Sequence, residues 1–83
     1  MPKIKVYFSD GYAVEFHEDQ TFQTIVRNET GSSLSQVFTL WSHHHDGLLP
    51  SFLEMTMYGL YFFDVENPTQ IFNSSAVTRI EIL

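Results

Sequence analysis

The hydrophobic residues of the chain change from a helical to a strand-like spacing near position 59. Residues 47–63 form its densest apolar run, and Pro50 suits the first turn of a helix, where an N–H lacks an intrahelical partner. Apolar or compatible residues recur at i, i+3, i+4, i+7, i+8 and i+11, as Leu49, Phe52, Leu53, Thr56, Met57 and Leu60. The pattern predicts one helix near residues 49–58, with this face buried and Gly59 ending it in a left-handed conformation.

A strand is expected directly after the helix. Residues 60–65, Leu-Tyr-Phe-Phe-Asp-Val, place apolar groups on both faces, which is typical of a central or covered strand. A helix that leads straight into a buried strand predicts where the core lies.

The N-terminal part predicts a β-hairpin whose register can be derived. Two alternating segments flank Ser9-Asp10-Gly11, and a two-residue Asp-Gly loop would mix apolar and charged side chains on one face. A three-residue loop instead pairs Phe8 with Tyr12, Val6 with Val14, Ile4 with Phe16 and Lys5 with Glu15. It also places Gly11 at the left-handed position of a bulge, so the three-residue loop is favoured.

The remaining segments complete an α+β pattern. Strands are expected at residues 21–27, where the spacing of Phe22 and Ile25 indicates an irregularity, and at 34–41, 70–73 and 76–83. The order is ββββ-α-ββ(β). We therefore expect a single domain, residues 1–83, with a mostly antiparallel, strongly curled or barrel-like sheet and one helix.

Charge narrows the classes of partner. Ten acidic residues oppose four basic ones, giving a net charge of −6, and no Lys or Arg occurs between Arg27 and Arg79. A nucleic-acid binder needs cations that neutralise phosphates, and an anionic membrane would repel this chain, so neither partner is expected. Without cysteine, a signal-peptide pattern or a long apolar run, the chain is expected to be a soluble cytoplasmic protein.

Three stretches resemble a family of small uncharacterised proteins from low-GC Gram-positive bacteria. They are Phe-Ser-Asp-Gly at residues 8–11, Asp-Gly-Leu-Leu-Pro-Ser at 46–51 and Asn-Ser-Ser-Ala-Val-Thr-Arg-Ile-Glu at 73–81. Together they cover under half of the chain, and none is a functional motif. The resemblance implies no activity and no site.

The histidine cluster is the one group of residues that suggests metal chemistry. His43 and His45 would project to one side of an extended segment, and with Asp46 they could ligate Zn²⁺, Ni²⁺ or Cu²⁺. His17 would have to lie alongside to give a third imidazole. The alternative, which we favour, is an exposed loop in which Asp46 caps the following helix.

No catalytic arrangement or cofactor motif is recognisable. Ser42, Ser51 and the histidines supply residue types for hydrolysis without a defining spacing, so we expect no enzyme activity and no cofactor.

A contact surface is a further hypothesis. It rests on apolar and aromatic residues that fall outside the expected buried faces, namely Met55, Tyr58, Tyr7 and Trp41. We therefore expect a small non-enzymatic interaction module that binds another protein or forms a homodimer. A divalent-metal-binding protein and an acidic decoy of a nucleic-acid-binding protein are the alternatives.

Overall fold

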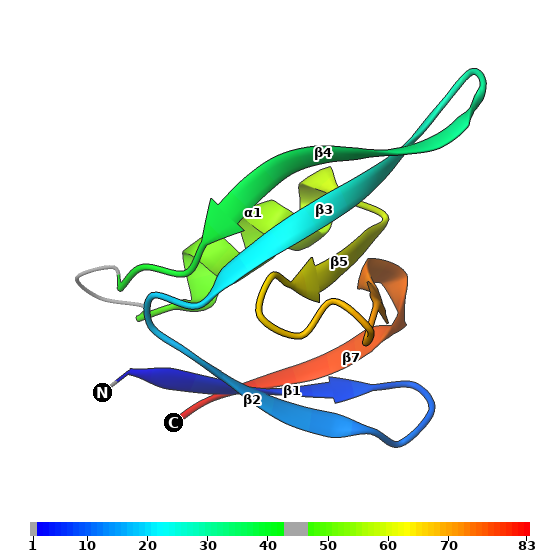
Figure 1. The fold of residues 1–83 in the computed structure, drawn as a ribbon. Coiled ribbons are helices and arrows are strands. Elements are labelled where there is room, and N and C mark those ends of the chain that lie inside the picture. Colours follow the sequence, from blue (N-terminus) through cyan, green and yellow to red (C-terminus); the bar gives the residue numbers. More distant parts are fainter. Residues whose placement is uncertain (1, 43–46) are drawn as a thin grey trace.

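Two antiparallel sheets and one helix make up the fold (Figure 1). The computed structural model describes residues 2–42 and 47–83. The elements are β1 (Lys3–Phe8), β2 (Ala13–His17), β3 (Thr21–Asn28), β4 (Gly31–Thr39), α1 (Leu49–Tyr58), β5 (Tyr61–Asp64), β6 (Phe72–Asn73), the 3-10 turn η1 (Ser74–Ala76) and β7 (Val77–Ile82). In this part of the chain, no helix has the length and apolar character needed to cross a bilayer.

The strands form two open sheets, so the expected α+β class with antiparallel pairing is confirmed, whereas the barrel-like closure is wrong. The first sheet has the order β2-β1-β7 and the second β4-β3-β5-β6. The chain passes between them at the turn after β2, where Asp19 adopts a left-handed φ of 71° and its N–H bonds to Leu40 O. Because β2 and β3 do not pair, the hairpins do not curl into one continuous sheet.

The N-terminal hairpin has the register derived from the sequence. Val6 pairs with Val14, and Phe8 N bonds to Tyr12 O across the three-residue loop. Gly11 has a φ of 91°, as the bulge position requires. The irregularity expected near Phe22 is also present, because the β3–β4 register shifts between Gln23 and Ile25.

Aromatic rings fill the space between the sheets. Phe16 of β2 lies 4.9 Å from Phe22, 5.8 Å from Phe52, 6.3 Å from Phe62 and 5.7 Å from Phe72, measured between ring centroids. The contacts with Phe22, Phe62 and Phe72 are edge-on, the geometry that aromatic quadrupoles favour. One ring thus connects the first sheet, the second sheet and the helix.

Helix α1 buries a different face from the one that the apolar spacing predicts. Leu53 and Met57 are exposed, and Met57 retains 87% of its accessible surface. The buried positions recur at i, i+3, i+4, i+7 and i+11, and they are Leu48, Ser51, Phe52, Met55 and Gly59. This stripe contains a serine and a glycine, so a count of apolar residues selects the neighbouring stripe instead.

The role of Gly59 also differs from the expectation. Its φ of −102° and ψ of 145° are extended rather than left-handed, so it does not end the helix by adopting a conformation reserved for glycine. A Cβ at this position would lie 2.8 Å from Thr24 Cβ on β3. The lack of a side chain at Gly59 therefore allows the chain to approach β3 closely at the end of α1.

Gly59→Ala is expected to lower the free energy of unfolding by about 1–3 kcal/mol, because the added methyl group overpacks the contact with Thr24. Urea denaturation followed by circular dichroism measures the change. Ser32→Ala, at an exposed position of β4, is the control and should leave the midpoint nearly unchanged. An unaltered midpoint for Gly59→Ala would contradict this role.

Candidate functional site

The two sheets present outer faces of opposite character. On the β2-β1-β7 sheet, three of the chain's four basic residues share the outer face with carboxylates, and we call this the charged face: Lys3, Lys5, Tyr7, Glu15, Arg79 and Glu81. Tyr7 lies between Lys5 Nζ, 5.3 Å from its ring centroid, and the Arg79 guanidinium, 4.0 Å away, and its hydroxyl donates to Glu81. Alternating charge of this kind is suited to contact with water.

The outer face of the β4-β3-β5-β6 sheet carries no charge at its centre. Residues paired directly across strands share a face, so the register assigns its central positions in two rows. We call these rows the neutral face: Leu34, Ile25 and Tyr61 in one, Val37, Gln23 and Phe63 in the other. Leu34, Val37 and Tyr61 expose 64%, 54% and 41% of their surface.

Gln23, the polar residue in the centre of the neutral face, already has hydrogen-bond partners within the protein. Gln23 donates from Nε2 to the carbonyl oxygens of Ser35 and Thr24, while Thr24 Oγ1, on the inner side, donates to Gln36 O at 2.6 Å. These bonds satisfy the carbonyls of the β4 bulge. The amide nitrogen of Gln23 therefore has acceptors within the protein, which lowers the polar cost of removing water from the neutral face.

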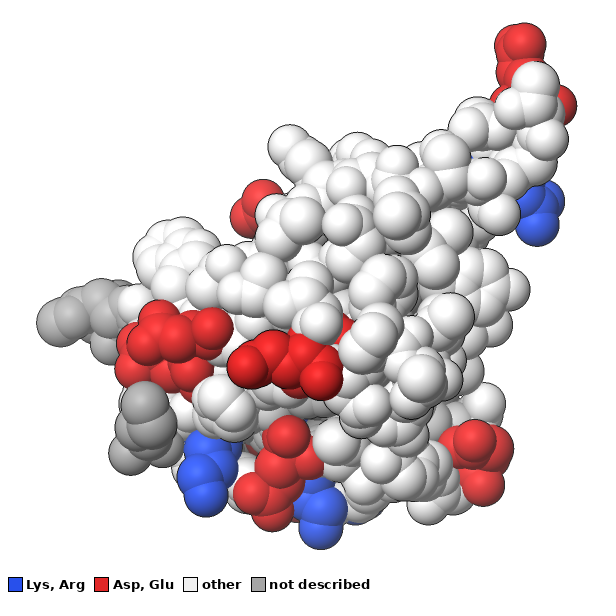
Figure 2. Space-filling model, in the orientation of Figure 1, with Lys and Arg blue, Asp and Glu red and all other residues white. Residues whose placement is uncertain are grey.

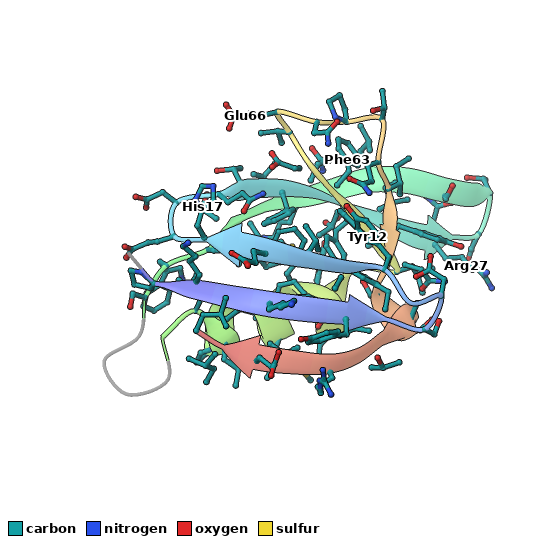
Figure 3. The ribbon with its side chains drawn as sticks, turned by 90° about the horizontal axis from the view of Figure 1, so that it is seen from below. Tyr12, His17, Arg27, Phe63 and Glu66 are labelled. Carbon is teal, nitrogen blue, oxygen red and sulfur yellow. The ribbon has the colours of Figure 1, made fainter. Side chains whose placement is uncertain are left out.

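Charges return only at the ends of the neutral face. Arg27 follows Ile25 by two positions on β3, and Glu66 lies in the connection after β5. In Figure 3 these two residues lie on opposite sides of Phe63. Figure 2 shows the acidic side chains in several separate groups, with an uncharged surface over β3 and β4 between them. The neutral face is therefore the candidate contact surface of this sheet.

The candidate interaction residues from the sequence do not form one surface. Met55, expected at a contact surface, is fully buried in the core, because the stripe of α1 that faces β3 includes it. Tyr7 belongs to the charged face, on the other sheet. Tyr58 packs against Phe38 of β4 with ring centroids 5.4 Å apart, and Trp41, 54% exposed, follows the same strand.

Sequence reasoning missed the residues of the neutral face, although a signal was present. Residues 30–42 contain no Asp, Glu, Lys or Arg, in a chain with a net charge of −6. That run contains the whole of β4 (Gly31–Thr39), including Leu34 and Val37. A long edge strand without charge is unusual unless something covers it.

The proposed metal ligands His43, His45 and Asp46 lie outside the described residues. His17 pairs with Lys3 at the end of β2, as expected, and its Nδ1 is 2.9 Å from Glu18 O. Within residues 2–42 and 47–83, no three histidine or acidic side chains come together as a metal site. Ser51, considered above as a nucleophile, is buried, and its hydroxyl contacts backbone groups of Trp41 and Leu48.

Comparison with known proteins gives no relative: no family model, curated protein or solved structure matches the chain. The resemblance to small proteins of Gram-positive bacteria remains a prediction.

Two substitutions on α1 test the assignment of its faces. Met55→Lys is expected to lower the free energy of unfolding by about 3 kcal/mol or more, because it places an unpaired charge in the core. Met57→Lys introduces the same group two residues away on the exposed side, and its effect should stay within about 0.5 kcal/mol. Thermal and urea unfolding of both variants gives the comparison. Equal effects would contradict the assignment.

Proposed function

We propose that this protein is a non-enzymatic interaction module that forms a homodimer through the neutral face. The observation that supports it is the contrast between the two sheets, since the charged face is suited to water and the neutral face is not. Exposed apolar side chains from three neighbouring strands lie side by side on this face instead of being scattered singly.

Charge favours a second copy of the chain as the occupant. Each molecule carries a net charge of −6, so two copies repel one another over most orientations. The neutral face is where they can approach without bringing carboxylates together. Because the neutral face carries no charge at its centre, it needs no complementary charge from its partner. The identical face of a second copy is also uncharged and can therefore pack against it.

The ends of the neutral face define one orientation of the two copies. If a two-fold axis runs across the strands between two facing sheets, Arg27 of one copy lies near Glu66 of the other, and the contact occurs twice. An axis along the strands would instead bring like charges together. We therefore propose the first arrangement, in which the two sheets pack face to face.

The size of the face predicts a weak dimer. Three strands spaced about 4.8 Å apart, each contributing about five residues at 3.3 Å per residue, give a flat footprint on the order of 250 Å². Stable interfaces bury about 800 Å² per partner, so the footprint of the neutral face alone is well below that size, and the surrounding loops must add to the contact. We expect a dissociation constant of tens to hundreds of micromolar.

Leu34→Glu should weaken association, because it places a carboxylate in the row of Leu34, Ile25 and Tyr61, at an exposed position of the neutral face, and raises the repulsion between copies. Sedimentation equilibrium from about 10 µM to 1 mM measures it, and we expect at least a tenfold weaker dimer, equivalent to about 1.4 kcal/mol.

The matched control is Leu53→Glu on α1, which makes the same change of charge at an exposed position away from the neutral face. It should associate nearly as the parent chain does. A parent chain that stays monomeric throughout this range, or equal loss of association in both variants, would refute the dimer through this face.

The proposed orientation makes a separate prediction about charge reversal. Arg27→Glu alone and Glu66→Arg alone should each weaken the dimer several-fold, because each creates two like-charge contacts. The double variant restores opposite charges and should recover most of the affinity, within the range of about 1 kcal/mol that exposed ion pairs contribute. Additive losses in the double variant would exclude this orientation while leaving the neutral face itself in place.

A further inference from the structure

A second feature, on the other side of α1, is a groove between the helix and the edge of β7. Its volume is about 440 Å³. The helical wall consists of Leu49, Leu53 and Thr56, which are spaced at i, i+4 and i+7 and so form one stripe. The opposite wall consists of consecutive residues of β7, from Val77 to Ile80. Because neighbouring residues of a strand point to opposite faces, a cavity lined by all of them lies against the strand's edge.

The edge of β7 in this groove has backbone groups that no described strand uses. Strand β7 ends the order β2-β1-β7, and Leu83 N bonds to Lys3 O of β1. Hydrogen bonding alternates along a strand, so Glu81 and Arg79 also bond toward β1. The N–H and C=O groups of Ile80 and Ile82 therefore point to the free edge.

The edge is open to an additional strand. It contains no proline, and its charged side chains, Arg79 and Glu81, are engaged with Tyr7 on the charged face. The lining residues of β7 span about 13 Å at 3.3 Å per residue, which accommodates an extended segment of about four residues. At the end of the groove, the buried hydroxyl of Ser74 has no hydrogen-bond partner among the described residues.

The walls of the groove define what side chains would fit. An added strand would direct alternate side chains toward the apolar stripe of Leu49 and Leu53, which favours aliphatic residues at those positions. The net charge of −6 attracts cations over a longer range, so basic residues beside the aliphatic core would speed association. The chain's own segment with this pattern, residues 3–6, belongs to β1, which is already paired with β2 and β7 on both edges.

We propose that the groove between α1 and β7 binds an extended, aliphatic segment of another protein, flanked by basic residues, which adds as a strand to the free edge of β7. Main-chain hydrogen bonds to Ile80 and Ile82 hold the segment, and the stripe of α1 selects its alternate side chains. This site is separate from the neutral face, and its occupation does not depend on the homodimer.

The test is a titration of the ¹⁵N-labelled full chain with the blocked peptide acetyl-Lys-Lys-Val-Thr-Val-Thr-Lys-Lys-amide, followed by amide chemical shifts. We expect saturable shifts concentrated on β7 and α1. The control peptide replaces both threonines by proline, which keeps the charge and removes two strand donors. Equal binding of the two peptides, or shifts confined to the neutral face, would overturn the proposal.

Two variants link binding to the groove. Ile80→Pro removes the N–H at the edge of β7 and should lower the affinity for the peptide at least about tenfold. Ile80→Ala shortens the same side chain but keeps the N–H, and it should lower the affinity less than about threefold. Leu53→Glu, at an exposed position, should also abolish binding without unfolding the chain. Leu34→Glu, designed against the homodimer, should bind the peptide normally. Undiminished binding by both Ile80→Pro and Leu53→Glu would refute the groove as the site.

Discussion

The position of Phe16 is the constraint on which the rest of the structure depends. Its ring is 2% exposed and touches aromatic rings of β3, α1, β5 and β6, so both sheets and the helix are packed against one side chain. Each such contact contributes about 0.5–1.5 kcal/mol beyond the burial of area. A domain of this size buries a smaller share of its surface than a large one does, and the chain has no cysteine with which to form a disulfide.

The small size of the domain also explains why the outer faces of the two sheets differ. One helix closes one side of the space between the sheets, and there is no second layer over either outer face in the described part of the chain. The β2-β1-β7 sheet meets water with paired charges around Tyr7. The other sheet exposes Leu34, Val37 and Tyr61 to water. Covering such a face with another surface lowers the free energy, because apolar side chains leave water.

The sequence was sufficient to predict the elements whose structure depends on residues close together in the chain. The turn at Gly11 fixes the register of the first hairpin, and Pro50 lies at the start of α1, so both follow from the sequence. The buried face of α1 does not, because it depends on contacts with residues distant in sequence, such as that of Gly59 with Thr24. The prediction of a barrel-like sheet failed because β2 and β3 do not pair, and the chain instead leaves the first sheet at the turn where Asp19 has a left-handed φ.

The candidate sites were hard to predict for a related physical reason. Whether an apolar residue belongs to a core or a surface depends on which of two faces turns inward, and one shift of register or one rotation of a helix reverses the answer. For this reason Met57, expected in the core, is exposed, and Met55, expected on a contact surface, is buried. The absence of charge over residues 30–42 is independent of such a shift, since a charged side chain is costly on any face that becomes covered. The interface proposed for this chain therefore rests on the run without charge and not on the positions of individual aromatic residues.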